Sequence, residues 1–170
     1  MDNAAFKQIQ PEQLQGNVFD EIGKKWMLIT AGNQAHFNTM TASWGAMGVM
    51  WNKPVAIVFV RPQRYTKEFI DREEIFTCSF FSDNERDALN FCGKYSGRDR
   101  DKVKETGLTP VFGQQGGVYF AQAQQVLVCR KLYAGVIRPE EFIVPDLLKN
   151  YTAGDYHCVY FGEILDALRK

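Results

Sequence analysis

The sequence predicts a mainly β protein, an antiparallel barrel decorated by a few short helices. Short segments rich in β-branched and aromatic residues recur along the chain, the helical segments between them are brief, and no βαβ rhythm repeats. The 170 residues, of which 45% are hydrophobic and 14% aromatic, suffice for one well-packed core. Because the composition has no break along the chain, we expect residues 1–170 to form one domain.

Charge and cysteine content limit the partners and the compartment. Twenty basic and twenty acidic residues cancel, which argues against a nucleic acid or an anionic membrane as the main partner. Residues 1–14 lack the basic and apolar regions of a secretory signal, and no apolar run reaches membrane length. The four cysteines have no Cys-x-x-Cys spacing, so we expect reduced, mostly buried thiols in a cytoplasmic protein, and no metal site.

Four strands are expected in the first half of the chain. They cover residues 25–31, 41–47, 54–60 and 75–81. Gly32 and Asn33 close the first of them in a turn, and we expect the second to pair with the first. The third is the most apolar run of the chain, and it is predicted to be buried on both faces. Thr66 is expected to be the N-cap of the short helix that follows, with Glu68 in its first turn.

The second half alternates short helices with strands. Ser82 and Glu85 have the capping-box spacing before a helix that is expected to stop at Gly93. The charged run 94–104 leads into another short helix, and it is either a solvated connector or a mobile flap over a ligand. The remaining expected elements are a turn at 113–117, two strands or one long bent strand at 118–136, a helical turn at 147–151, a last strand at 157–165 and a polar tail at 166–170.

The stretch from His36 to Tyr65 carries the strongest functional signal. Small hydroxyl and amide side chains precede a glycine-broken turn with two tryptophans, so polar donors lie beside aromatic faces. Arg61 and Arg64 stand just before the expected helix start, a position that favours an anion. The plainer interpretation is that Pro62 begins a tight turn and the arginines are ordinary surface charges. Together, the two segments suit a ligand with one phosphate and one flat ring.

Four segments carry a resemblance to a known family. They are Asn38-Thr39-Met40-Thr41-Ala42-Ser43-Trp44-Gly45, Lys53-Pro54-Val55, Arg61-Pro62-Gln63-Arg64-Tyr65-Thr66 and His157-Cys158-Val159-Tyr160-Phe161-Gly162-Glu163-Ile164. Over residues 17–168 the chain resembles the flavin reductase-like, FMN-binding split-barrel family, and in particular its flavoredoxin-like branch. The resemblance implies a Greek-key split barrel, usually a homodimer with flavin bound at or near the subunit interface.

The resemblance also implies roles for individual residues. It assigns flavin contacts to Asn38, Thr39, Met40, Thr41, Ser43 and Trp44, and the phosphate end to Arg61, Arg64, Tyr65 and Thr66. Ser96 and Arg98 are additional candidates for cofactor contacts. His157 is the catalytic candidate, because a histidine begins the matching strand in the family and could face the nicotinamide or the flavin edge. A buried packing role for His157 is the alternative, and His36 has no comparable support.

Two functions of different class follow from the resemblance. The first is a flavin reductase that transfers hydride from NADH or NADPH to flavin, and the second is a non-enzymatic, flavoredoxin-like electron carrier without its own nicotinamide site. In both, FMN would carry the chemistry and the protein would hold it. An open stacking surface over the flavin, for which Trp44, Trp51 and His157 are candidates, would distinguish the two. A base-stacking oligonucleotide binder is a third interpretation, against which the zero net charge counts.

Overall fold

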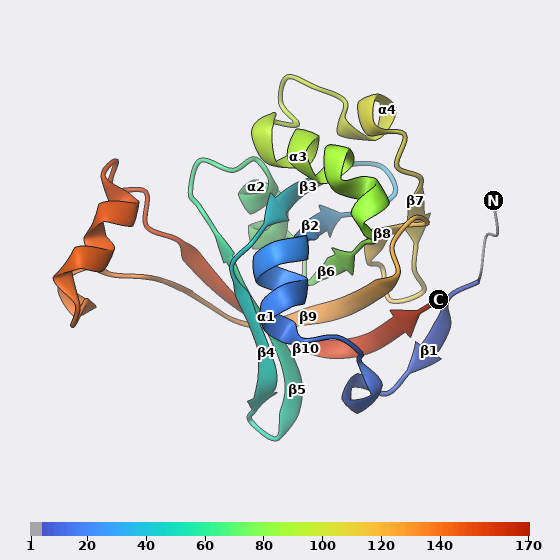
Figure 1. The fold of residues 1–170 in the computed structure, drawn as a ribbon, viewed down its shortest axis with the longest axis horizontal. Helices are drawn as coiled ribbons and strands as arrows, with labels where there is room; N and C mark the ends of the chain where they lie inside the picture. The colour runs from blue at the N-terminus through green and yellow to red at the C-terminus, as the bar shows by residue number, and fades with distance from the viewer. Residues whose placement is uncertain (1–4) are drawn as a thin grey trace.

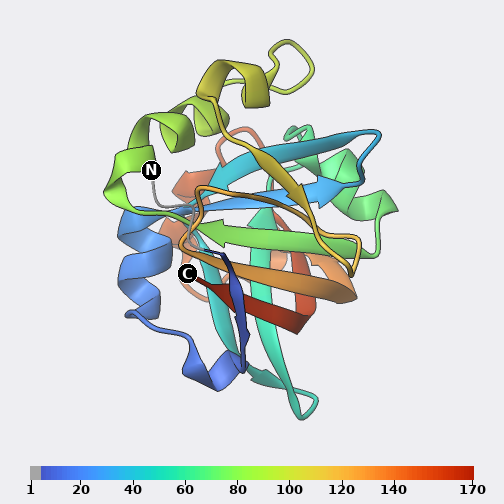
Figure 2. The same cartoon turned by 90° about the vertical axis from the view of Figure 1, so that its right-hand side faces the viewer.

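The computed structural model describes residues 5–170 and is built around one eight-stranded sheet (Figure 1). Its strands are β1 (Lys7–Ile9), β2 (Met27–Gly32), β3 (Phe37–Ala42), β4 (Gly45–Met50), β5 (Lys53–Val60), β6 (Ile75–Phe80), β9 (Gln125–Val136) and β10 (Cys158–Arg169). They run in the order β3-β2-β6-β9-β10-β5-β4, and β1 also joins β10. All pairings are antiparallel, and the sheet curls into a barrel that does not close (Figure 2). The predicted antiparallel split barrel is therefore confirmed.

The opening of the barrel lies between β3 and β4, which follow each other in the chain. β3 pairs with β2, β4 pairs with β5, and no ladder joins β3 to β4 within residues 5–170. Ser43 and Trp44 are their only connection along the chain. The prediction of one continuous strand at 41–47 is wrong, because the two parts of that segment pair with opposite ends of the sheet.

The other strands of the first half are close to their predictions. β2 and β6 confirm the segments at 25–31 and 75–81, and the turn after β2 is closed by a hydrogen bond from the Asn33 amide to the His36 carbonyl at 3.0 Å. β5 is not buried on both faces as predicted. Alternate residues of β5 point into the barrel, and on the other face Ile57 and Phe59 are only half-buried.

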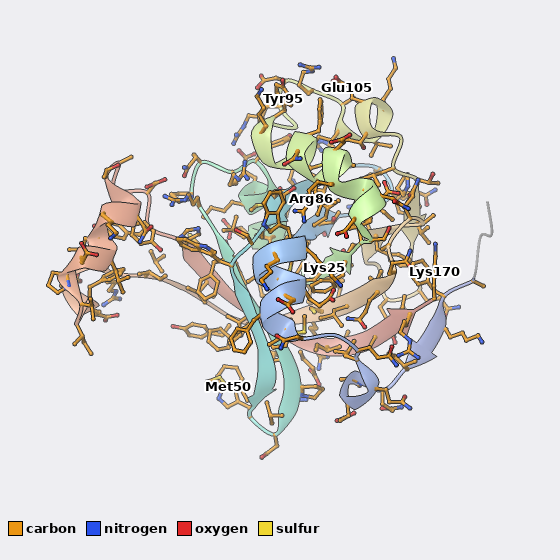
Figure 3. The ribbon with its side chains drawn as sticks, viewed as in Figure 1. Lys25, Met50, Arg86, Tyr95, Glu105 and Lys170 are labelled. Carbon is orange, nitrogen blue, oxygen red and sulfur yellow. The ribbon has the colours of Figure 1, made fainter. Side chains whose placement is uncertain are left out.

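Short α-helices surround the barrel. They are α1 (Val18–Asp20), which continues as a π-helical segment through Lys25, then α2 (Thr66–Arg72), α3 (Arg86–Lys94) and α4 (Lys102–Thr106). Arg86, labelled in Figure 3, ties α3 to the π-helical segment. Its guanidinium donates to the Lys24 carbonyl at 2.8 Å and lies 4.3 Å from the centre of the Trp26 ring.

Neither predicted helix cap forms as expected. Tyr65, not Thr66, occupies the N-cap position of α2; the Thr66 hydroxyl is fully buried and accepts a hydrogen bond from the Asn38 amide at 2.8 Å. Ser82 precedes a 3-10 turn, Asp83–Glu85, and its side chain makes no capping hydrogen bond. The helix after this turn is confirmed as α3, which ends one residue beyond the predicted stop at Gly93.

The C-terminal half contains a second, small sheet made of β7 (Pro110–Phe112) and β8 (Val118–Phe120), joined by the predicted turn at 113–117. The segment 118–136 forms two strands, β8 and β9, which was one of the two alternatives. The predicted polar tail at 166–170 is wrong, because β10 continues to Arg169 and pairs there with both β1 and β9. Ala167 is buried in this extension, so its side chain belongs to the core.

Two apolar clusters stabilise the fold on the two sides of the sheet. The larger one lies inside the barrel and includes Ile29, Phe76 and Tyr160, while the smaller one includes Leu89 of α3 and Phe120 of β8. Gly162 permits a close contact with Phe76, since a Cβ atom there would lie 2.5 Å from the Phe76 ring. The four cysteines are free and buried, as expected.

The connection between β9 and β10 forms a projecting arm, which we define as residues 137–156. It holds two 3-10 turns, Pro139–Glu141 and Pro145–Tyr151, the second of which confirms the predicted helical turn at 147–151. The arm extends away from the barrel, in orange and red at the left of Figure 1. The arm exposes apolar side chains to solvent, and Ile143 is 95% exposed. No helix in residues 5–170 is long and apolar enough to cross a lipid bilayer.

Candidate functional site

A cleft of about 440 Å³ opens where the barrel is split. Its walls are formed by the end of β3, the Ser43–Trp44 link, the end of β5 and the residues just before α2 and β10. The lining residues are Met40, Thr41, Ala42, Ser43, Trp44, Phe59, Arg61, Gln63, Arg64 and His157. We call it the first cleft. Its volume lies in the range of ordinary small-molecule sites, about 300 to 1,000 Å³.

The first cleft brings together most of the residues that the sequence singled out. Those that line it are Met40, Thr41, Ser43, Trp44, Arg61, Arg64 and His157. Asn38, Thr39 and Arg98 instead line a second cleft of about 520 Å³. Tyr65, Thr66 and Ser96 line neither cleft.

Several of the predicted polar side chains on β3 are already hydrogen-bonded within the protein. The Asn38 amide donates to Thr66, and the hydroxyls of Thr39 and Thr30 are 2.8 Å apart. The Thr41 hydroxyl donates to the Leu89 carbonyl at 2.5 Å, which holds β3 against α3. These side chains therefore fix the shape of the strand, and the backbone of β3 is left to face a ligand.

The two arginines of the first cleft differ in their partners. Arg61 pairs with Asp155 of the arm at 2.5 Å and donates to the Asn150 carbonyl at 3.0 Å. Arg64 donates to the Gly93 carbonyl at 2.7 Å and has no carboxylate partner among the described residues. Burial and the neighbouring Arg61 lower the pKa of Arg64, yet a guanidinium stays charged at neutral pH. Arg64 is thus the cation best placed to meet an anionic ligand.

His157 lies beside the link that splits the barrel. Its ring centre is 5.0 Å from that of Trp44, and its Nδ1 atom is 2.9 Å from the Tyr151 hydroxyl. Burial lowers the pKa of His157 to about 4, and the nearby Arg61 charge acts in the same direction. The imidazole is therefore neutral at neutral pH and offers one donor and one acceptor rather than a positive charge.

The predicted connector at 94–104 is docked against the barrel through its Ser96-Gly97-Arg98 segment. A Cβ atom on Gly97 would lie 1.9 Å from the Asn38 side-chain oxygen, so only glycine fits against β3 at this point. Arg98 lies over the Tyr65 ring at 4.6 Å and pairs with Glu68. These contacts favour the connector interpretation over the flap.

Sequence reasoning missed several residues around the two clefts. Phe59 could have been found from the alternation along β5, and Gln63 lies inside the segment 61–66, in which the resemblance assigns roles to its neighbours only. Lys102 gave no signal within its charged run, yet its ammonium is buried and donates to the Thr39 and Cys92 carbonyls at 2.7 and 2.9 Å. Burial lowers the pKa of Lys102 to about 8.

Trp51, a candidate for the stacking surface, lies elsewhere. It is in the turn of the β4–β5 hairpin, where its ring centre is 5.8 Å from that of Phe161. It does not line the first cleft, and Trp44 and His157 do.

The side chains of the first cleft are suited to binding a ligand rather than to reacting with it. Among the described residues, the titratable side chains of the first cleft are His157, which is neutral, and the two arginines, and these form no pair suited to exchange protons near neutral pH. Trp44, Phe59 and Met40 offer apolar surface for a flat ring, and Arg64 offers charge for an anion. Such a site suits a bound group that carries its own reactivity.

Comparisons with known proteins agree with this geometry. The sequence matches the family model described as "Flavin reductase like domain" over residues 19–169. A search of curated protein sequences found no significant relative. The fold is similar to that of three solved structures, all below 25% identity, so these likenesses concern the fold alone.

The first is flavoredoxin from Methanosarcina acetivorans, with a TM-score of 0.67 and 22% identity over 86% of this chain and 68% of that one. The second is an FMN-binding protein from Thermus thermophilus, with a TM-score of 0.70 and 16% identity over 96% and 82%. The third is an NADH:FAD oxidoreductase from Streptomyces globisporus, with a TM-score of 0.65 and 18% identity over 86% and 75%. With the family model covering nearly its whole length, this chain belongs to the flavin reductase-like domain family.

Proposed function

We propose that the protein binds FMN in the first cleft and acts as a flavin reductase that takes hydride from NADH or NADPH. The observation that carries this proposal is the combination in one cleft of an aromatic wall, Trp44, with a cation, Arg64, that has no carboxylate partner in the part of the chain that the structure describes. Family membership supports it, as do neighbours described as binding FMN and as an NADH:FAD oxidoreductase.

The residues of the first cleft fit FMN in size and chemistry. Met40, Trp44 and Phe59 would flank the flat ring, while Ser43 and the exposed edge of β3 would meet its polar rim. Arg64 would hold the phosphate by charge-assisted hydrogen bonds. When bound, FMN supplies the hydride acceptor. The protein would orient the nicotinamide against the flavin. His157 would contribute a neutral polar group beside Trp44, where the nicotinamide could stack.

A flavoredoxin-like electron carrier remains the second candidate, because the structural neighbours include flavoredoxins. The carrier would use the same cleft residues without a nicotinamide site. The two candidate functions differ only in whether the surface beside Trp44 and His157 binds a nicotinamide.

The visible spectrum and anaerobic reduction test the proposal. The purified protein loaded with FMN should show flavin maxima, and NADH or NADPH should bleach them without oxygen. His157→Ala should slow this bleaching more than it weakens FMN binding. Bleaching by dithionite but by neither nicotinamide would support the electron carrier, and a protein that retains no flavin would contradict both.

We further propose that the protein is a homodimer, as the family resemblance implies. Exposed apolar side chains gather at the tip of the β4–β5 hairpin, where Met50 is labelled in Figure 3, and on the projecting arm. Trp51 and Asn52 have left-handed φ angles of 53° and 56°. Bulky aromatic residues such as Trp51 rarely adopt this backbone conformation. Aromatic anchors of this kind supply much of the energy of protein interfaces. Sedimentation at micromolar concentration should give a dimer, and a species of monomer mass would contradict it.

A further inference from the structure

The projecting arm returns to the barrel at the first cleft, and one of its residues turns inward there. Tyr151 ends the 3-10 turn Pro145–Tyr151 and is 7% exposed, the only buried residue of that turn. Leu147, in the same turn, is exposed. The arm thus buries one side chain against the barrel while its tip stays in solvent.

Tyr151 touches both polar groups at its end of the cleft. Its hydroxyl lies 2.9 Å from Nδ1 of His157, and the two rings meet edge to face with centres 5.5 Å apart. The guanidinium of Arg61 lies over the Tyr151 ring at 5.2 Å. The Tyr156 ring also stacks on Tyr151, with ring centres 4.8 Å apart, so the Tyr151 ring is held in place by packing.

The two nitrogens of His157 have different surroundings. Nδ1 faces Tyr151, while Nε2 has no hydrogen-bond partner in residues 5–170. Ser79 Oγ is the one fully buried side-chain polar atom without a partner in that range, so Nε2 is not sealed within the protein. Since His157 lines the first cleft, Nε2 is the atom that a ligand there can reach.

The direction of the bond decides what Nε2 offers. A phenol is a stronger hydrogen-bond donor than a neutral imidazole N–H, and an imidazole lone pair is a stronger acceptor than a phenol oxygen. In a neutral pair the favoured arrangement has the Tyr151 hydroxyl donating to Nδ1, and the single imidazole proton then resides on Nε2.

We propose that Tyr151 is a positioning residue that holds His157 in the tautomer protonated at Nε2, so that the first cleft presents a neutral N–H donor to a carbonyl oxygen of its ligand. The inference rests on the proposed function in one respect, since the carboxamide oxygen of a nicotinamide is the carbonyl that a flavin reductase would place there. The tautomer itself depends only on the residues of this chain.

Nitrogen NMR of the 15N-histidine-labelled protein at neutral pH tests the tautomer directly. The wild-type spectrum should show His157 protonated at Nε2, with the signals of His36 identified through His36→Gln. Tyr151→Phe keeps the ring but removes the hydroxyl, so His157 should become a mixture of both tautomers. Tyr156→Phe is the matched control on the same arm, since its hydroxyl makes no hydrogen bond in residues 5–170, and it should leave His157 unchanged. Protonation at Nδ1 in the wild type, or an unchanged tautomer in Tyr151→Phe, would overturn the proposal.

A second measurement connects the tautomer with ligand binding. In Tyr151→Phe the KM for NADH or NADPH should rise by about 2- to 13-fold, as for the loss of one neutral hydrogen bond, while FMN affinity stays within about twofold. An equal loss of both would make Tyr151 a structural residue and overturn its positioning role. If neither nicotinamide is oxidised at all, the reductase function fails, and the NMR result still decides the tautomer by itself.

Discussion

The two clefts at the two ends of β3 are similar in size and both contain cations, yet their cations are engaged differently. In the second cleft Arg98 pairs with Glu68, Arg100 pairs with Glu105, and Lys102 donates to two carbonyls. In the first cleft Arg64 donates to the Gly93 carbonyl and has no carboxylate partner within residues 5–170. The number of positive residues is therefore a poor guide to an anion site, and what matters is whether a cation still lacks a carboxylate partner.

The comparison is tested most strongly by removing the phosphate from the ligand. Riboflavin lacks the group that Arg64 would hold, so it should bind at least about 10- to 150-fold more weakly than FMN, the cost of one lost charge-assisted contact. Fluorescence quenching of each flavin by the protein gives both dissociation constants. Comparable values would remove the phosphate site from the first cleft.

The next largest effect should come from the arginines themselves. Arg64→Ala should weaken FMN binding by roughly 1.5 to 3 kcal/mol, which is about 10- to 150-fold. Arg98→Ala is the control in the second cleft and should change the affinity by less than about threefold, because Glu68 already engages Arg98. The distinction between the clefts would be lost if Arg98→Ala weakened binding as much as Arg64→Ala.

Lys102 allows a test of the second cleft through stability. Its native pKa of about 8 lies below the ordinary value of 10.5, so between these pH values the unfolded chain holds a proton that the native protein has released. The free energy of unfolding should therefore rise with pH across this window, by on the order of 1 to 3 kcal/mol. Below pH 8 the contribution of Lys102 to the free energy of unfolding should not change with pH. Urea unfolding at several pH values should show this rise in the wild type and a flatter profile in Lys102→Met. Parallel profiles would mean that Lys102 is not desolvated.

The smallest effect concerns the arm. Asp155→Asn removes the carboxylate that pairs with Arg61 and should strengthen FMN binding by up to about fivefold, since a partly exposed ion pair is worth about 0 to 1 kcal/mol. Asp146→Asn changes an acidic residue of the same arm that pairs with Lys149, and it should have no effect. Weaker binding in Asp155→Asn would show that Asp155 orients Arg61 for the ligand instead of competing with it.

Local patterns in the sequence predicted much of the fold and much of the first cleft. The β-branched runs identified β2, β5 and β6, and two short motifs supplied Ser43, Trp44 and Arg64, because the residues of each motif are close in the chain. The position of the split was not predictable in this way. Residues 41–47 look like one strand, and only the pairing partners, which are distant in sequence, separate β3 from β4.

Three residues that sequence reasoning missed, Tyr151, Asp155 and Lys102, share the same cause. Tyr151 and Asp155 of the arm contact Arg61, which lines the first cleft. They are 90 and 94 residues away from Arg61 along the chain. Lys102 is buried because α3 and β3 close over it, which a charged run cannot indicate. Contacts between residues that are distant in the sequence determine these positions, and local sequence patterns do not reveal such contacts.

The open edges of β3 and β4 have a consequence for how a ligand is held. Strands at the two ends of a sheet leave a row of backbone N–H and C=O groups without a neighbouring strand. The end of β3 lines the first cleft, whereas β4 does not, and Lys102 already occupies the Thr39 carbonyl. The rim of a flavin ring also carries carbonyl and N–H groups, so a ligand lying in the first cleft can pair with the backbone at the end of β3 as a neighbouring strand would. Filling the cleft would then slow amide hydrogen exchange at the end of β3 and leave exchange in β4 unchanged, although both strands lie at an edge of the same sheet.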